Sequence, residues 1–170
     1  AYLASDEARP IILKVISSEK LQEQLKIVAE QMASSKNMPF MIRCFKSDLV
    51  MQVNIEQMRR AWSNVLANAL EYTELEQGID IKMSEGIREG CSYLCAKVSD
   101  YGQGFLKEDM EFATEEFYRG DKSRHDRSHQ GLGLAIVKRF LESQGGFLEL
   151  GNSEETGGAE VTLWVKGEEK

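Results

Sequence analysis

Residues 127–146 read R-S-H-Q-G-L-G-L-A-I-V-K-R-F-L-E-S-Q-G-G and join a glycine-rich entrance to a helical pattern. After the second glycine, apolar side chains recur at helical spacing at Leu134, Ile136, Val137, Phe140 and Leu141. Gly145 and Gly146 predict the end of this helix. Glycines at a helix entrance leave backbone N–H groups uncovered at the positive end of the helix dipole. Gly131 and Gly133 therefore indicate a phosphate-binding turn, although a helix that merely follows a flexible turn would give the same pattern.

The composition limits the class of protein. A chain of 170 residues with 42% hydrophobic and 29% charged residues predicts one soluble globular domain. The net charge of −7 argues against a nucleic-acid-binding surface. No apolar run is long enough for a membrane span, and the start of the chain lacks a signal-peptide layout, so we expect a cytoplasmic domain that could be part of a longer chain. Three cysteines are too few for a disulfide framework or a zinc site.

The remaining segments predict strands and helices without strict β-α-β alternation. A strand is expected at residues 11–16, and Ser17 or Ser18 is expected to cap the helix that follows. Further strands are expected at residues 40–46, 49–53, 78–84, 93–98, 147–151 and 160–166, with a turn region at 86–90 and another turn at Gly157-Gly158. This order favours an α+β fold, a two-layer α/β sandwich with a mixed, mainly antiparallel sheet and helices on one face.

Residues 54–73, N-I-E-Q-M-R-R-A-W-S-N-V-L-A-N-A-L-E-Y-T, form the second decisive stretch. Asn54 and Gln57 resemble a capping box, which predicts a helix from about residue 55 to residue 72. Asn64 and Asn68 then lie one turn apart on the same face. Asparagine is a poor residue for a helix interior, so this pair needs a reason. Either the face is simply wetted, or the Asn68 side-chain oxygen, supported by Asn64, binds magnesium.

The sequence D-Y-G-Q-G-F at residues 100–105 follows a predicted strand. A carboxylate at the end of a buried strand is costly unless a group donates to it, and an adenine amino group is such a donor. Asp100 would then select adenine, and Gly102 and Gly104 would let the backbone approach a flat ring. The alternative is an ordinary turn.

Residues 117–130 are polar and basic, and they directly precede the glycine turn. The cations in this stretch are Arg119, Lys122, Arg124 and Arg127. Such a segment is typical of a mobile lid that closes over phosphates. A solvated basic loop would have the same composition.

The four segments resemble a known family when taken in order. N-V-L-A-N-A-L-E-Y-T, D-Y-G-Q-G-F, F-Y-R-G-D-K-S-R and G-L-G-L-A-I-V-K are similar to the N, G1, F and G2 boxes of sensor histidine kinases. The resemblance covers residues from about 18 to 166 and implies their catalytic ATP-binding domain, the Bergerat fold shared with the Hsp90, gyrase and MutL ATPases. It implies an ATP and Mg²⁺ site with catalytic residues Asn64 and Asn68, of which Asn68 is the metal ligand. The implied ATP-binding residues are Asn68, Tyr72, Asp100, Gly102, Gly104, Lys122, Arg124, Gly131, Leu132, Gly133 and Leu134.

The resemblance also implies a reaction and partners. The activity would be that of a protein-histidine kinase, which transfers the ATP γ-phosphoryl group to a histidine on a separate dimerisation domain. Residues 1–17 would be the edge or linker from that domain, and residues 18–170 the catalytic domain. The isolated chain would lack the acceptor, because its histidines, His125 and His129, fall in the lid. A response regulator would receive the phosphoryl group next, and the full-length protein would be a homodimer associated with the membrane, without nucleic-acid partners.

Several positions depart from the family pattern. Glu71 stands where a basic residue is usual, Tyr101 where asparagine is usual, and Ala159-Glu160 where small hydroxyl residues are common. Glu71 should weaken ATP binding unless a lid cation substitutes or its side chain turns away. The alternative is a degenerate nucleotide-binding domain with a docking or regulatory role. A chaperone or DNA-repair ATPase is the other rival, but Asn64 stands where that branch has a glutamate base, so transfer is favoured over hydrolysis.

Overall fold

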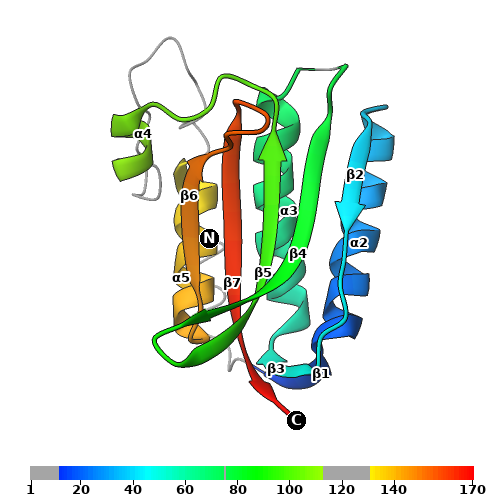
Figure 1. Ribbon diagram of the computed structural model, residues 1–170, viewed down its shortest axis with the longest axis vertical. Helices are drawn as coiled ribbons and strands as arrows, with labels where there is room; N and C mark the ends of the chain where they lie inside the picture. The colour runs from blue at the N-terminus through cyan, green and yellow to red at the C-terminus, as the bar shows by residue number, and fades with distance from the viewer. Residues whose placement is uncertain (1–11, 75, 113–130) are drawn as a thin grey trace.

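The computed structural model describes residues 12–74, 76–112 and 131–170 (Figure 1). Its strands form one sheet in the order β1-β3-β7-β5-β4-β2, and β6 pairs with β7. The strands are β1 (Lys14–Ser17), β2 (Phe40–Arg43), β3 (Leu49–Val53), β4 (Ile79–Arg88), β5 (Cys91–Asp100), β6 (Phe147–Asn152) and β7 (Ala159–Glu169). Within the described residues the β2–β4 pair is parallel and the other pairs are antiparallel. The predicted mixed, mainly antiparallel sheet is confirmed.

Three long helices cover one face of this sheet (Figure 1). They are α2 (Ser18–Ser35), α3 (Ile55–Tyr72) and α5 (Gly131–Ser143). A short helix, α4 (Lys107–Phe112), lies off the edge of the sheet formed by β6, near its upper end in Figure 1. Ser17 is the residue that caps α2, since its hydroxyl accepts a hydrogen bond from Lys20 N at 3.2 Å. Asn54 Oδ1 accepts a hydrogen bond from Gln57 N at 2.9 Å and caps the start of α3. Both ends of α3, Ile55 and Tyr72, lie where the sequence predicts.

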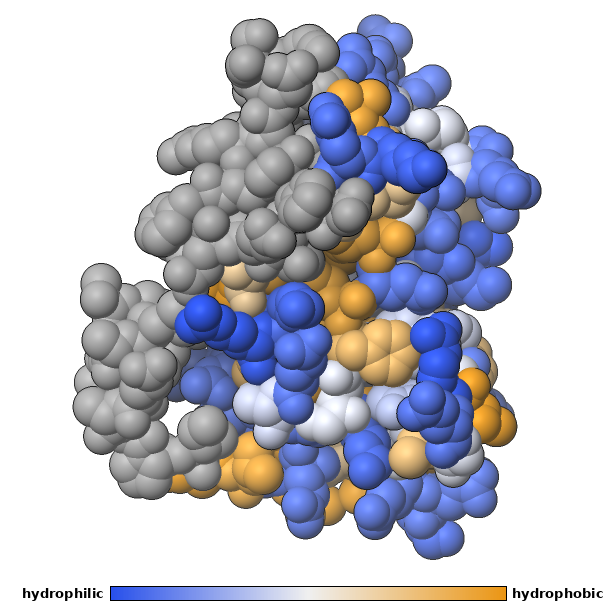
Figure 2. All heavy atoms as spheres, turned by 90° about the vertical axis from the view of Figure 1, so that its left-hand side faces the viewer, coloured by the Kyte–Doolittle hydropathy of each residue, from blue (hydrophilic) through white to orange (hydrophobic). Residues whose placement is uncertain are grey.

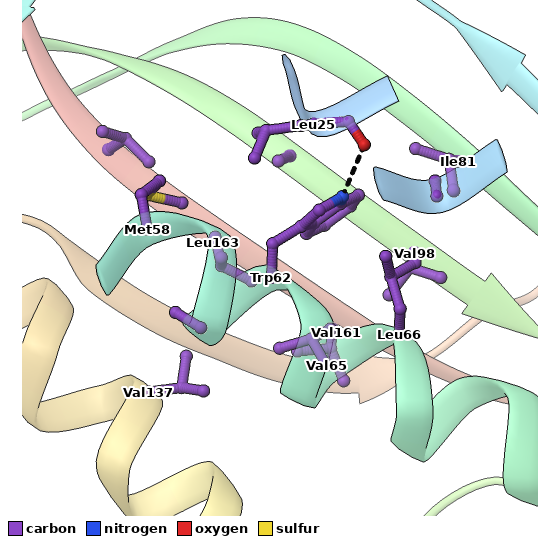
Figure 3. Close-up of a cluster of buried hydrophobic side chains, with 14 of the residues drawn as sticks. Leu25, Met58, Trp62, Val65, Leu66, Ile81, Val98, Val137, Val161 and Leu163 are labelled. Carbon is purple, nitrogen blue, oxygen red and sulfur yellow. Dashed lines mark hydrogen bonds between the residues drawn. The ribbon is translucent and has the colours of Figure 1, made fainter. Parts of the chain in front are cut away.

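The core fills the space between the helices and the sheet. Alternate residues of β5 and β7 face the helices and are buried: Leu94, Ala96, Val98, Val161, Leu163 and Val165. Trp62 of α3 lies at the centre of this layer (Figure 3), and its Nε1 donates to the Leu25 carbonyl of α2 at 2.9 Å. Since α3 packs on α2, on α5 and on the sheet, its polar face is held at a fixed place.

The end of α5 confirms the role predicted for its two glycines. Gly146 N donates to Leu141 O at 2.8 Å, and Gly145 N donates to Glu142 O at 3.3 Å. Gly145 has φ of +84°, which the helix-ending motif requires and which glycine adopts without a steric penalty. The chain can therefore turn directly from α5 into β6.

Other boundaries differ from the predictions. β4 and β5 are each longer than expected and meet at a two-residue turn, Glu89-Gly90, with φ of +52° and +77°. Positive φ at both central residues fits a type I′ hairpin turn. This two-residue turn replaces the wide turn region expected at residues 86–90. β1 is four residues, Lys14–Ser17, rather than 11–16, and β2 ends at Arg43 rather than at residue 46.

The three cysteines are free thiols, with Cys44 next to β2 and both Cys91 and Cys95 in β5. None of the helices in the described ranges is long and apolar enough to cross a membrane.

Candidate functional site

Several polar segments meet at one end of the molecule, the upper end in Figure 1. The last turn of α3, the end of β5, the turn between β6 and β7 and the first turn of α5 all lie there. Hydrogen bonds link the first three of these segments, and α3 packs against α5. The structure thus brings three of the sequence-predicted segments to the same end.

Asp100 ends β5 and is only 1% exposed. Its Oδ1 accepts hydrogen bonds from two backbone N–H groups, those of Gly102 and Ala159, each at 3.0 Å. The Thr156 hydroxyl donates to the Asp100 carbonyl at 2.6 Å and accepts from Gly158 N at 3.1 Å. The two backbone N–H donors compensate the cost of burying the carboxylate and fix its orientation, and the Thr156 hydroxyl holds the backbone of the same residue.

Close backbone approaches explain the glycines around Asp100. A Cβ at Gly102 would lie 2.2 Å from the Tyr72 carbonyl oxygen, and one at Gly158 would lie 2.4 Å from Asp100 Oδ1. Gly104 has φ of +82°, and a Cβ there would lie 2.7 Å from Asn152 Oδ1. The sequence predicts Gly102 and Gly104 as room for a ligand ring and Gly158 as part of a turn, whereas the contacts that require all three in the structure come from the chain itself.

Asn152, at the end of β6, holds the segment after this turn. Its Oδ1 accepts from Phe105 N at 2.7 Å, and its Nδ2 donates to Phe105 O at 2.9 Å. The two hydrogen bonds imitate a strand pair and fix the segment that leads into α4. Sequence reasoning missed Asn152, because its partner lies 47 positions away and no local pattern predicts the pairing.

Tyr101 is anchored at its backbone and at its side chain. Its N–H donates to Thr73 Oγ1 at 2.8 Å, and its hydroxyl donates to Asp80 Oδ2 at 2.8 Å. The hydrogen bond to Asp80 raises the pKa of the Tyr101 hydroxyl, because the protonated form is the donor, and burial adds to the rise. Tyrosine is thus accommodated at the position where the family usually has asparagine.

The two amides of α3 lie in different surroundings. Asn68 is 1% exposed, whereas Asn64 is partly buried and lines a groove of about 440 Å³ beside Ile136 of α5. Tyr72 is partly buried at the end of the helix, and Glu71 is exposed. The pair therefore shares a face, as predicted, but only Asn68 lies in the interior.

The glycines of residues 131–134 lie within α5 rather than ahead of it. α5 begins at Gly131, so Gly133 and the buried Leu134 belong to its first turn, as does the backbone of Leu132. First-turn N–H groups point out of the N-terminal end of a helix and suit an anion. Lys122 and Arg124 lie outside the described residues, as do His125 and His129.

One side of the molecule has a surface of mixed polarity. Figure 2 shows hydrophobic side chains gathered in the middle of the face that lies on the left in Figure 1, with hydrophilic side chains around them. In the described parts of the chain, no cluster of three or more histidine, cysteine, aspartate or glutamate side chains could hold a metal ion.

A family model and known relatives match this chain. The model described as histidine kinase-, DNA gyrase B-, and HSP90-like ATPase matches residues 53–169. The sensor histidine kinase SpaK of Bacillus subtilis is 33% identical over 163 residues, which are 95% of this chain and 34% of SpaK. The sensor histidine kinase WalK of Bacillus subtilis (strain 168) is 30% identical over 117 residues, which are 68% of this chain and 19% of WalK. The chain therefore spans about a third or less of the length of these relatives.

Solved structures share the fold. A mycobacterial sensor histidine kinase, MprB, matches with a TM-score of 0.70 and 18% identity, covering 94% of this chain and all of the other (100%). The catalytic domain of the histidine kinase ThkA matches with a TM-score of 0.66 and 17% identity, covering 91% of this chain and 95% of the other. Full-length ShkA, solved in complex with AMPPNP, matches with a TM-score of 0.70 and 23% identity, covering 96% of this chain and 33% of the other.

Proposed function

The chain belongs to the family of histidine kinase-, DNA gyrase B- and HSP90-like ATPases, and from that membership we propose that it is the ATP-binding catalytic domain of a sensor histidine kinase. The relatives it matches over most of its own length are sensor histidine kinases, which favours this branch over a degenerate or ATPase role. In this proposal the domain binds ATP with Mg²⁺ and presents the γ-phosphoryl group to a histidine on a separate dimerisation domain.

The placement of Asp100 carries the proposal. Its carboxylate is buried, oriented by two backbone donors and located where β5 meets the end of α3. We propose that it accepts the adenine amino group, which guanine lacks at the equivalent ring position. Tyr72, Gly102 and Gly104 would border the base.

A magnesium ion fits the donors of α3. Mg²⁺ prefers oxygen ligands and usually takes one or two protein groups together with substrate phosphates and water. The Asn68 carboxamide provides such an oxygen from a buried position on a rigid helix, and Asn64 lies one turn earlier. The ion would neutralise phosphate charge; Asn68 would hold it, and Asn64 would support that side of the site.

The proposed reaction needs positioning and charge stabilisation more than covalent chemistry. A histidine nitrogen forms a bond to the γ-phosphorus, the bond from that phosphorus to the β,γ-bridging oxygen breaks, and ADP leaves with the electron pair. The backbone N–H groups of residues 131–134 would bind phosphate oxygens, and Lys122 and Arg124 would add positive charge. Asn64 cannot act as a general base, so hydrolysis of ATP by this chain alone should be slow.

The larger protein is part of the proposal. The acceptor histidine would lie on a dimerisation domain joined through residues 1–17, and a response regulator would take the phosphoryl group from it. The full-length kinase would be a homodimer associated with the membrane, with this domain in the cytoplasm, and it would not bind nucleic acid.

Calorimetry with Mg²⁺-ATP and Mg²⁺-GTP tests the proposal. Asp100→Asn should lower the ATP affinity at least about tenfold, because an amide presents an N–H group where a carboxylate oxygen accepts from adenine, a loss of about 1.4 kcal/mol or more. The fold should persist, because the Asn side-chain oxygen can still accept from Gly102 and Ala159. Asp48→Asn, an exposed position in the loop before β3, is the matched control and should bind as the native chain does.

Two results would contradict the proposal. If the native chain binds no ATP at millimolar concentration, the alternative of a degenerate domain with a docking or regulatory role is favoured. Steady-state hydrolysis by the isolated chain that disappears in Asn68→Ala would favour the ATPase branch instead.

A further inference from the structure

Thr73 is the first residue after α3 and is buried, with 8% of its surface exposed. Its side-chain oxygen makes two short contacts, donating to Gly78 O at 2.6 Å and accepting from Tyr101 N at 2.8 Å. Its own backbone N–H donates to Ala69 O at 3.0 Å and closes the last turn of α3. One residue thus links the end of α3, the start of β4 and the end of β5.

These bonds join the two halves of the proposed nucleotide site. Ala69 directly follows Asn68, and Tyr101 directly follows Asp100. A continuous path therefore runs from the Asn68 turn through Thr73 to the Asp100 turn, by way of two hydrogen bonds. The close approach of Gly102 to the Tyr72 carbonyl lies beside this path and keeps the same two segments in contact.

Resting on the proposed function, we propose that Thr73 is a positioning residue that sets the distance between the adenine-binding carboxylate and the metal-binding amide. Thr73 touches neither adenine nor phosphate in this proposal. A nucleotide that binds both ends needs the two ends at one fixed separation, and an error of about 1 Å can cost about a hundredfold in a positioned reaction. A ligand that binds only the adenine end does not need that separation.

Two other side-chain hydrogen bonds hold the Asp100 turn to different segments. Thr156 holds the Asp100 carbonyl to the β6–β7 turn, and the Tyr101 hydroxyl holds the turn to β4 through Asp80. Neither bond reaches α3. Of these three hydrogen bonds, the one from Tyr101 N to Thr73 connects the turn to the end of the amide-bearing helix.

The test compares Mg²⁺-ATP with adenosine in calorimetry on the native chain, Thr73→Val and Thr73→Ser. Thr73→Val keeps the shape but removes the hydroxyl, and it should lower the Mg²⁺-ATP affinity about tenfold or more while adenosine changes less than about twofold. Thr73→Ser keeps the hydroxyl and should preserve the native ratio of the two affinities. Thr156→Val is the matched control, since it removes a hydroxyl on the other side of Asp100, and it should lower both affinities by a similar factor.

Equal losses for both ligands in Thr73→Val would show a merely structural role and overturn the inference, while leaving the proposed function intact. A native chain that binds neither ligand would overturn both. If Thr73→Val does not fold, Thr73→Ala takes its place with the same criterion, because the shorter side chain admits a water molecule to Tyr101 N and Gly78 O.

Discussion

Two side chains of the candidate site differ from the family pattern. Tyr101 stands where asparagine is usual, and its hydroxyl bonds to Asp80, a residue of the neighbouring strand. Glu71 stands where a basic residue is usual, and it is exposed on the last turn of α3, next to Tyr72. The first substitution has a structural partner that accounts for it. The second puts an acidic, exposed side chain at the position where the family pattern implies a cation that contacts phosphate.

Glu71→Lys should increase the affinity for Mg²⁺-ATP. The change removes repulsion of the triphosphate and adds attraction, but both charges are exposed to solvent, so the gain should be about three- to tenfold at low salt. Calorimetry at two ionic strengths checks this, because the gain should shrink as salt rises. Glu23→Lys on α2, also exposed, makes the same change in net charge and should have little effect. An equal gain in both variants would show that net charge alone is responsible.

At the scale of elements, the caps and turns hold the site-bearing segments. Asn54→Ala should destabilise the protein by about 1 kcal/mol, because the first turn of α3 loses its acceptor for Gln57 N. Urea unfolding measures the change. Asn54→Asp keeps that acceptor and removes only the donation from Nδ2 to Ile12 O, so it should cost less. If both variants lose the same stability, the hydrogen bond from Asn54 Nδ2 to Ile12 O, and not the helix cap, is responsible for it.

Glu89→Asn should stabilise the β4–β5 hairpin. Glu89 has φ of +52° at the first central position of the turn, a conformation in which asparagine is far more common than glutamate. We expect about 0.5–1 kcal/mol of added stability, seen as a higher urea midpoint with an unchanged slope. Gly90 has φ of +77°, which residues with a Cβ rarely adopt, so Gly90→Ala should destabilise the protein. A loss in Glu89→Asn would mean that the Glu89 side chain has a role in the native hairpin.

These elements also show what sequence reasoning can reach. α3 is predicted to the residue, because a cap, a helical period and a terminating segment agree locally. The Glu89-Gly90 turn is predicted too wide, because glutamate gives no signal for positive φ. Asp100 is chosen correctly as a buried strand-end carboxylate, whereas its partners Thr156 and Ala159 are not, since they lie more than fifty positions away. Local patterns predict elements, and pairings between distant segments require the fold.

At the scale of the whole molecule, β5 lies inside the sheet, between β4 and β7, and it carries both Asp100 and Cys95. Cys95 is 6% exposed, and burial, with a smaller effect of Glu149, raises its pKa from 9.0 to about 11. The native thiol therefore stays protonated at pH 8, with about one molecule in a thousand ionised. Because the folded pKa lies above the unfolded one, this group's contribution to stability is complete below pH 9 and is lost as pH rises from about 9 to 11.

Alkylation of Cys95 should consequently report the opening of the central sheet. In a Cys44→Ser, Cys91→Ser variant, iodoacetamide at pH 8 should modify Cys95 at least about a thousandfold more slowly in native buffer than in denaturant, because reaction requires global unfolding. Bound Mg²⁺-ATP should slow it further by the factor 1 + [ligand]/Kd, since the nucleotide binds only the folded chain. Fast labelling in native buffer would show that β5 opens locally. If labelling is slow but saturating Mg²⁺-ATP leaves its rate unchanged, β5 opens without disrupting the site that contains Asp100.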